Sequence, residues 1–440
     1  MKNKKIVFAA GLMLICLQGI FAQPNPPAPK TAEVDKKFSE TIAKNLVQLQ
    51  QKTEVSSERR RQAYEKLLEG QRHIWNININ RQRLAPSALA TYARLAKQSL
   101  QAAIELDPTL AEGYTALAEL AKNTPPYNID DAILLADIAV KIDADNFGSH
   151  QILAQLFTFN SKLNRGVLDS NFTQKAINEW KEVARLDPRN AEAFAFLSEL
   201  YARTNKTEES LKALRNWLSA AAPLNNGFYG RVFQGEKLAP EAASVKLGAA
   251  LVKVGQNREA VEILSRAVAD DPEDTEAVEL LSRALENADN DSARIAVQAL
   301  QQAVFANPDN SALVFLLAEV QARTGKINDA AKIVSEATAK LIVTDKISAA
   351  NLQVILGDIY LQSSRFDEAV ASYQNALTIR GVIENKPVLE SERGFAIRVF
   401  DKMIDTYNKA KRPNDVKAVI ERARTLLGKN DLFADKKIVS

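Results

Sequence analysis

Two histidines, His73 and His150, are the residues of this chain best suited to acid–base or metal chemistry near neutral pH. They lie far apart in the sequence, and neither belongs to an HExxH motif. His150 occupies a position on the packing face of an expected helix, so we interpret it as a core residue. His73 stands beside Trp75 in the stretch 74–80, which we expect to be irregular and which could leave His73 in an exposed loop. Neither histidine is predicted to take part in catalysis.

The other polar motifs also point away from an enzyme. The sequence has no Walker-type glycine loop, no GxSxG elbow and no dinucleotide-binding fingerprint. Paired carboxylates such as Asp130/Asp131 fall at expected helix boundaries, where capping explains them. We therefore predict a non-catalytic protein with no cofactor and no metal site. An enzyme with a site assembled near residues 223–240 is the less favoured alternative.

The first 22 residues have the features of a secretory signal peptide. Three lysines among the first five residues precede an apolar run over residues 6–17, and Ala22 closes a small-residue cleavage site. Because this run is short for a membrane span, we expect export with cleavage after Ala22. Retention as an uncleaved N-terminal anchor is the alternative, since Ile20 is not the small residue preferred at that position.

Removal of residues 1–22 would change the chemistry of the chain. The only cysteine, Cys16, would be lost, so the mature chain could form neither a disulfide nor a thiolate metal site. Lys+Arg would fall from 57 to 54 and equal the 54 Asp+Glu, so the charge gives no support for a nucleic-acid partner. No later stretch is apolar over a length that would span a bilayer.

A triplet of the form Ala–x₃–large–x₂–Ala recurs along the chain. Its spacings of four and three residues place the three side chains on one face of an α-helix. The small alanines allow a neighbouring helix to approach closely, while the large central residue fills the space between the two helices. Clear copies are Ala96/Leu100/Ala103, Ala260/Leu264/Ala267, Ala296/Leu300/Ala303, Ala330/Val334/Ala337 and Ala369/Tyr373/Ala376.

A second packing stripe precedes most triplets and predicts a first helix in each repeat. Asn205, Gly255 and Gly325 lie between the two helices and tolerate the left-handed conformation that ends a helix. A proline that cannot continue the second helix follows it in several copies. The first-helix stripes include Phe194/Leu197/Ser198/Tyr201, Val314/Leu317/Ala318/Gln321 and Gln353/Leu356/Gly357/Tyr360, and the prolines are Pro108, Pro188, Pro272 and Pro308.

In these residues the chain resembles the tetratricopeptide-repeat (TPR) family. That family combines large–x₂–Leu–Gly–x₂–Tyr in helix A with Ala–x₃–Phe–x₂–Ala and a proline in helix B. The best copy spans residues 353–376. The resemblance implies an all-α, right-handed superhelical solenoid of antiparallel helix pairs with about nine repeats. The copies are placed at 61–110, 111–146, 147–190, 191–222, 241–274, 275–310, 311–344, 350–383 and 397–430.

The repeats and the breaks between them predict the domain organisation. An amphipathic stripe from Val34 to Leu49 predicts a helix that covers the first repeat. Glycines and aromatic residues interrupt the helical pattern at 223–240, as either a hinge or a packed loop, and a smaller break covers 381–394. The expected parts are a signal peptide (1–22), a Pro-rich linker (23–30), an N-terminal capping helix (31–56), TPR sub-array 1 (57–222), a linker or insertion (223–240), TPR sub-array 2 (241–383), a C-terminal TPR-like repeat (384–430) and a tail (431–440).

The resemblance further implies that helix A lines the concave surface, on the face opposite its packing stripe. The ninth residue of each repeat belongs to that face and is acidic in six of the nine copies. An acidic groove would suit a basic or polar extended segment of a partner, whereas a general preference for Glu at exposed helix positions explains the pattern equally well. The predicted partner-binding residues are Glu119, Glu199, Glu319, Asp358, Asp401 and Asp405; Glu69 occupies the same position in the first repeat.

The same register argues against one activity that the family resemblance brings to mind. A clamp for the acidic C-terminal tails of chaperones would carry Lys and Asn at the fifth and ninth positions of helix A. This chain has Ala195/Glu199 and Phe315/Glu319 there, so chaperone-tail binding is not expected.

Together, the signal peptide and the repeats predict an exported, periplasmic scaffold of the cell envelope that binds an extended protein or peptide segment. A membrane-tethered assembly or secretion factor, with an uncleaved N-terminal anchor, is the alternative.

Overall fold

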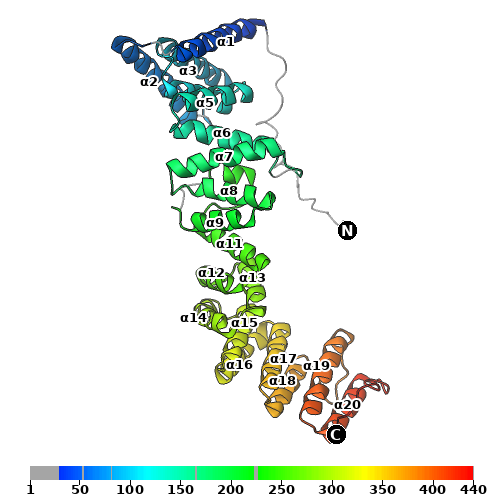
Figure 1. Cartoon of the computed structure of the whole chain (residues 1–440). Coiled ribbons are helices and arrows are strands. Elements are labelled where there is room, and N and C mark those ends of the chain that lie inside the picture. Colours follow the sequence, from blue (N-terminus) through cyan, green and yellow to red (C-terminus); the bar gives the residue numbers. More distant parts are fainter. Residues whose placement is uncertain (1–28, 52–53, 81, 164–165, 222–225, 440) are drawn as a thin grey trace, which may run out of the picture. The chain divides into compact units, whose positions relative to one another are not determined.

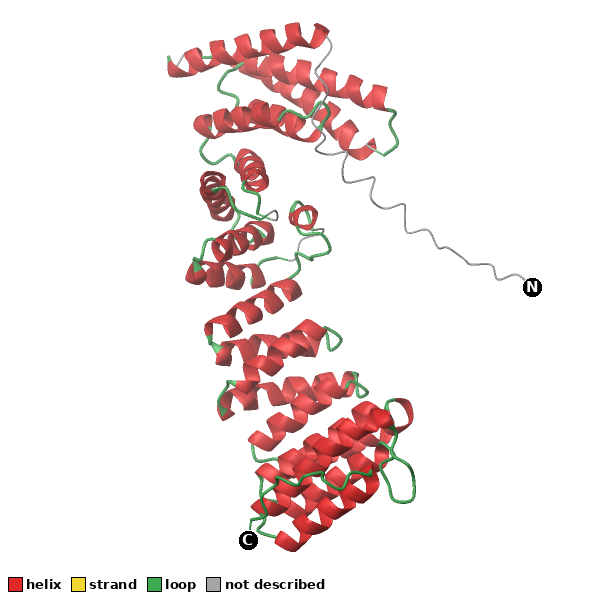
Figure 2. Cartoon of the chain, turned by 90° about the vertical axis from the view of Figure 1, so that its right-hand side faces the viewer, coloured by secondary structure: helices red, strands yellow, loops and turns green. Residues whose placement is uncertain are grey.

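The computed structural model of the chain describes residues 29–51, 54–80, 82–163, 166–221 and 226–439. The predicted signal peptide and residues 23–28 of the predicted linker lie outside this part. In the described residues the chain forms twenty α-helices and no β-strand (Figures 1 and 2). The all-α prediction is therefore confirmed.

Contacts within the chain divide it into two compact units, residues 1–204 and 205–440, which we describe separately. The helices of the first unit are α1 (Pro29–Gln50), α2 (Ser57–Asn80), α3 (Pro86–Leu106), α4 (Ala111–Asn123), α5 (Ile129–Ile142), α6 (Phe147–Asn160), α7 (Ser170–Leu186) and α8 (Ala191–Arg203). Those of the second unit are α9 (Thr207–Leu218), α10 (Tyr229–Val232), α11 (Pro240–Val254), α12 (Asn257–Asp270), α13 (Thr275–Glu286), α14 (Asn290–Ala306), α15 (Ser311–Arg323), α16 (Ile327–Thr344), α17 (Lys346–Gln362), α18 (Phe366–Ile379), α19 (Glu390–Lys409) and α20 (Pro413–Leu427).

Each predicted repeat coincides with two consecutive helices, which confirms the TPR-like helix pairs. The alanine triplets form the packing face of the second helix, and all their members are buried except the half-buried Ala267. Asn205, Gly255 and Gly325 have φ values of 57°, 77° and 82°, so the turns take the expected left-handed conformation. The superhelix and its handedness concern both units together and stay predictions.

Two glycines show how closely the paired helices approach. Gly357 of α17 faces Tyr373, the central residue of the triplet in α18, and a Cβ atom at position 357 would overlap the tyrosine ring. Gly248 of α11 faces Leu264 of α12 in the same way. The first helix of these pairs therefore needs glycine at this position because the second helix places its largest side chain there.

Helix α1 occupies most of the segment expected to cap the array, although it begins at Pro29 and ends at Gln50. Phe38 and Ile42 are buried. The amide Nδ2 of the buried Asn45 donates to Ile104 O and to the Tyr114 hydroxyl, both at 2.9 Å. These contacts fix α1 on α3 and α4, and burial raises the pKa of Tyr114 to about 12.

Three sequence-based boundaries were wrong. The stretch 74–80 is not irregular but forms the last two turns of α2, because Ile77 is buried against Ala96 and Leu120. His73 is therefore a half-buried helical residue, with its ring centroid 6.0 Å from that of Tyr92. Helix α7 already begins at Ser170, inside residues 160–173, where the repeat pattern predicts an insertion between the two helices of the third copy. Helix α19 begins at Glu390, inside the expected break at 381–394.

The segment 226–239 is packed rather than an open hinge. Tyr229 of the short helix α10 is fully buried, with its ring centroid 5.5 Å from that of Trp217. Trp217 Nε1 donates to Leu238 O at 3.1 Å, and Leu238 N donates to Asn226 Oδ1 at 3.0 Å. This segment belongs to the second unit, where it covers one end of α9.

Among the described residues, no helix combines the length and the apolar character that crossing a bilayer requires.

Candidate functional site

The first unit contains an open groove of about 570 Å³ between α2, α4 and the beginning of α6. Most of its residues come from the first helix of three successive repeats, as the family resemblance implies for the concave face, and the others come from the turn between α5 and α6. The groove is lined by Gln71, Ile74, Trp75 and Asn78 of α2, by Glu112, Thr115, Ala116 and Glu119 of α4, and by Asp143, Asp145, Asn146, Phe147 and Gly148 at the α5–α6 junction.

Trp75 is the largest side chain of the groove and leaves 59% of its surface exposed. Tyr64, Leu68 and Ile79 are also exposed, by 48%, 63% and 57%, and their spacing places them with Trp75 on one face of α2. Large apolar side chains gathered on an exposed helix face are typical of a surface that binds another molecule. Trp75 lies where this face meets the groove.

Four carboxylates surround the groove. Asp145 forms an ion pair with Arg185 at 2.5 Å, and Asp143 Oδ1 accepts a hydrogen bond from Asp145 N at 3.0 Å. Glu112 and Glu119 of α4 have no ion pair with any residue in the described part of the chain. The groove therefore presents unneutralised negative charge beside an indole ring. Of the residues predicted from the acidic pattern, Glu119 is the one that lines it.

A network of hydrogen bonds holds the α5–α6 rim of the groove against α4. Asn146 caps α6 by accepting from Ser149 N at 2.9 Å. The hydroxyl of Thr115 in α4 donates to Asn146 Oδ1 at 3.0 Å and lies 2.8 Å from the Ser149 hydroxyl. The rim is fixed in position because the same side chains cap the first turn of α6 and form hydrogen bonds with the neighbouring helix α4.

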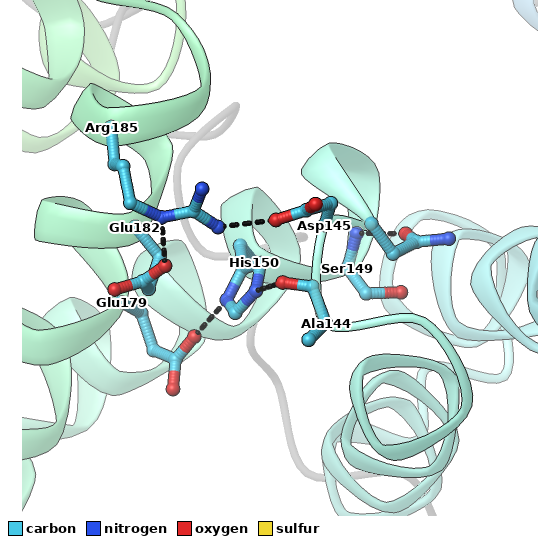
Figure 3. Close-up of polar contacts among 8 residues, drawn as sticks. Ala144, Asp145, Ser149, His150, Glu179, Glu182 and Arg185 are labelled. Atoms are coloured by element: carbon cyan, nitrogen blue, oxygen red, sulfur yellow. Dashed lines mark hydrogen bonds and ion pairs between the residues drawn. The ribbon is translucent and has the colours of Figure 1, made fainter.

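His150 supports this rim from behind (Figure 3). The imidazole is 4% exposed, its Nδ1 lies 2.7 Å from Glu179 Oε2, and its Nε2 lies 3.1 Å from Ala144 O. The hydrogen bond to Glu179 raises the pKa of His150 above its ordinary value, against the opposing effect of burial. Both ring nitrogens face acceptors, so a protonated ring can donate a hydrogen bond to each of them. His150 is thus a packed core residue, as the sequence indicated, and it ties the rim to α7.

In the second unit Glu319 lies half-buried on α15. Burial raises its pKa above the ordinary range, Arg323 opposes this effect, and Glu286 adds to it. Arg323 donates to Leu285 O and Ala288 O, so its guanidinium is held at the end of α13. Glu319 is a poorly solvated carboxyl rather than an open negative charge.

Asp358 is fully engaged within its own unit. Lys402 Nζ lies 2.8 and 2.9 Å from its two carboxylate oxygens, and the Tyr373 hydroxyl donates to Oδ1 at 2.7 Å. The sequence pattern identified the carboxylate but not the lysine of α19 that neutralises it, because the two residues lie in different repeats.

Asp401 and Asp405 are also paired, with Lys436 beyond the last helix at 2.5 and 3.2 Å. Among the remaining predicted residues, Glu69 forms an ion pair with Lys66 at 2.8 Å, and Glu199 is a half-buried residue of α8. The structure thus brings Asp401 and Asp405 together but leaves Glu69 and Glu199 outside the groove lining.

Trp75 was not predicted as a groove residue, because residues 74–80 were expected to be an irregular stretch. An available signal was the exposed apolar spacing of Tyr64, Leu68, Trp75 and Ile79. Within the described residues no three His, Cys, Asp or Glu side chains are grouped in a way that could hold a metal ion. The side chains that line the groove can stack on a bound molecule, form hydrogen bonds with it and attract cations.

Helix pairs repeated along the chain define an α-helical repeat protein. Family models described as tetratricopeptide repeat match residues 165–226, 245–294 and 288–341, and a second such model matches residues 354–385. These matches identify the helix pairs of the matched segments as tetratricopeptide repeats. Such repeats typically serve as protein-interaction scaffolds.

Several solved structures are similar to this chain. A tetratricopeptide repeat protein from Parabacteroides merdae has 14% identity and a TM-score of 0.29, and the match covers 67% of this chain and 99% of that one. The C-terminal part of a TPR repeat-containing protein from Cytophaga hutchinsonii has 12% identity and a TM-score of 0.34, covering 65% and 98%. MamA from Desulfovibrio magneticus has 21% identity and a TM-score of 0.26, covering 44% and 97%. A comparison with curated proteins finds no match.

Proposed function

We propose that this protein is a non-catalytic interaction scaffold of the cell envelope that binds an extended segment of a partner protein in the groove between α2, α4 and α6. The observation that carries the proposal is Trp75, an exposed indole beside the unpaired carboxylates Glu112 and Glu119. Exposed tryptophans of this kind are enriched among the residues that dominate binding energy.

The chemistry of the groove favours a basic segment. A Lys or Arg side chain can lie over the indole face while its charge is balanced by Glu112 and Glu119. The exposed apolar face of α2 would cover the aliphatic part of such a segment. The groove is wide and open, which suits a chain passing along it better than a buried small molecule.

A photoreactive amino acid at position 75 tests the groove directly in cells. We expect it to cross-link a defined partner, whereas the same group at Phe305 of α14, which is 88% exposed, serves as a control and should not. Introducing Glu119→Lys into the chain with the probe at position 75 should remove the product. Identical products from positions 75 and 305 would contradict the proposal.

With the cross-linked partner in hand, Trp75→Ala is expected to weaken binding by about tenfold or more, since anchor residues of this type contribute about 2 kcal/mol. The free energy of unfolding should stay within about 0.5 kcal/mol of the wild-type value, because the side chain is exposed. Isothermal calorimetry and chemical denaturation measure the two quantities. Phe305→Ala is the matched control and should change neither.

The envelope location rests on the sequence of residues 1–22. Sequencing the N-terminus of the mature protein separates export with cleavage, which gives a start at Gln23, from the alternative of a retained membrane anchor, which leaves Met1 in place. Cell fractionation gives a second test, since a protein found wholly in the cytoplasm would contradict both versions.

A further inference from the structure

The segment after α20 folds back onto the second unit (Figure 2). We call residues 429–439 the C-terminal tail. Gly428, with φ of 63°, ends α20, and Leu432 and Phe433 then pack against the core of the last helices. Arg424 Nε donates to Leu432 O at 3.0 Å. The first half of the tail is therefore anchored in the fold.

The second half of the tail is held by one face of α19. Lys436 Nζ lies 2.5 Å from Asp401 Oδ1 and 3.2 Å from Asp405 Oδ1. The close ion pair with Asp401 raises the pKa of Lys436 above its ordinary value, burial opposes this, and Asp405 adds to the rise. The two carboxylates are one turn apart on α19 and together form a lysine-binding pair.

The next turn of α19 binds the tail backbone. Asn408 Nδ2 donates to Lys437 O at 3.0 Å, and Asn408 Oδ1 accepts from Val439 N at 3.0 Å. A side-chain amide that makes both bonds recognises an extended main chain whatever side chains it carries. This face of α19 thus recognises a lysine through Asp401 and Asp405. Through Asn408 it recognises the carbonyl of the following residue and the amide two residues further on.

We propose that this face of α19 is a second binding site, which takes an extended lysine-bearing segment of a partner protein, and that residues 436–439 are an internal occupant which the partner displaces. The site belongs to the second unit, and the proposal stands independently of the groove at Trp75.

The contacts of the tail show why displacement is feasible. The side chain of Lys436 is 32% exposed and that of Asp405 is 53% exposed, and ion pairs with this exposure stabilise weakly. Ile438 and Val439 remain 40% and 47% exposed, so the end of the tail buries little apolar surface. The tail is favoured mainly because it is covalently attached and therefore present at high local concentration.

A partner would gain contacts that the tail does not make. An open hollow of about 310 Å³ continues along the same surface from Asp405 and Asn408 to Leu361, Lys402 and Asp358. A segment longer than the tail could extend into this hollow while its lysine occupies the Asp401–Asp405 pair. Such a segment would bind over a larger area with the same backbone register.

A fluorescein-labelled peptide with the sequence of residues 434–440 is the probe for this site. The full-length Lys436→Glu variant should bind the probe at least about tenfold more tightly than wild-type protein, because its own tail is repelled by Asp401 and Asp405. The Lys437→Glu variant carries the same charge change on an exposed side chain and should bind as weakly as wild type. Fluorescence anisotropy measures the affinities, and circular dichroism verifies that each variant is folded.

The recognition elements are tested in the Lys436→Glu background. Adding Asn408→Ala, or Asp401→Asn with Asp405→Asn, should abolish probe binding, and a probe with Glu at its first lysine should not bind. Trp75→Ala should leave the affinity unchanged. Equal binding by Lys436→Glu and wild type would overturn the proposal, as would a concentration-dependent dimer that exchanges tails, which would make a second copy the occupant. Hydrogen exchange at the Val439 amide, expected to accelerate in Lys436→Glu, gives a readout independent of the probe.

Discussion

At the scale of single residues, His150 connects α7 to the rim of the groove without lining the groove. Its ring joins Glu179 on α7 to Ala144, which precedes the groove residues Asp145 and Asn146. The other charged groups nearby are Glu182 and Arg185, which pair at 2.7 Å. The protonated ring donates to both acceptors, whereas a neutral ring can donate to only one.

The pH dependence of stability should reveal this role. The folded-state pKa of His150 is raised above 6.5, so its stabilising contribution is complete below pH 6.5 and is lost as the pH rises through the folded-state pKa. We expect His150→Gln to lower the free energy of unfolding by about 1–3 kcal/mol below pH 6.5 and to remove this pH dependence. Chemical denaturation across the pH range measures both effects. His73→Gln is the control and should retain the wild-type dependence, since His150 is intact.

The acidic pattern shows how far site residues could be predicted. Counting repeats placed Glu119 in the groove lining and Asp401 beside Asp405, because the helical register follows directly from the spacing of packed residues. The neutralising lysines could not be found in this way. Lys402 and Lys436 reach carboxylates through the packing of different segments, and local periodicity carries no information about such contacts.

At the scale of helices, the fold was predictable wherever a repeat is regular. The triplets and turn residues determine the helix pairs, because each of these residues has a size or backbone conformation that suits one position in the pair. The predictions failed at the irregular ends of helices, as in 74–80, where burial of Ile77 continues α2 through a sequence rich in Asn and Ile. Tertiary packing outweighed the weak helix propensity of these residues.

The contact between Gly357 and Tyr373 provides a test of helix pairing. Gly357→Ala should lower the free energy of unfolding by about 1–3 kcal/mol, because the added methyl overlaps a buried ring that cannot move aside. Gly394→Ala in α19 is the matched control, since its methyl would meet only Arg398 Nη1 at 3.8 Å. That variant should be neutral or more stable by about 0.5–1 kcal/mol. Equal destabilisation of the two variants would mean that the α17–α18 contact is not tight.

At the scale of the whole molecule, each unit is built from helices that pack against their neighbours along the chain. The last core of the second unit is shared by α17 to α20, with Tyr373, Phe400 and Met403 fully buried in it. In a repeat array each helix pair is stabilised mainly by its neighbours, so damage at one end should remain local.

A chain truncated after residue 389 tests this locality. It lacks α19 and α20 and exposes the buried face of α18, so we expect aggregation detectable by light scattering. Hydrogen exchange in residues 54–204 should remain as in the full chain, because these residues belong to the first unit, which the truncation leaves intact. General loss of protection across both units would show instead that the array unfolds as a single cooperative body.

The position of the C-terminal tail has a practical consequence for how partners are sought. An affinity tag fused after Ser440 extends the chain one residue beyond Val439, whose amide is bonded to Asn408. Such a fusion changes the sequence that competes for the α19 face, and a basic tag would add positive charge next to Asp401 and Asp405. A purification tag placed in an exposed loop of the second unit would leave the sequence of the tail, and therefore its binding to the α19 face, unchanged.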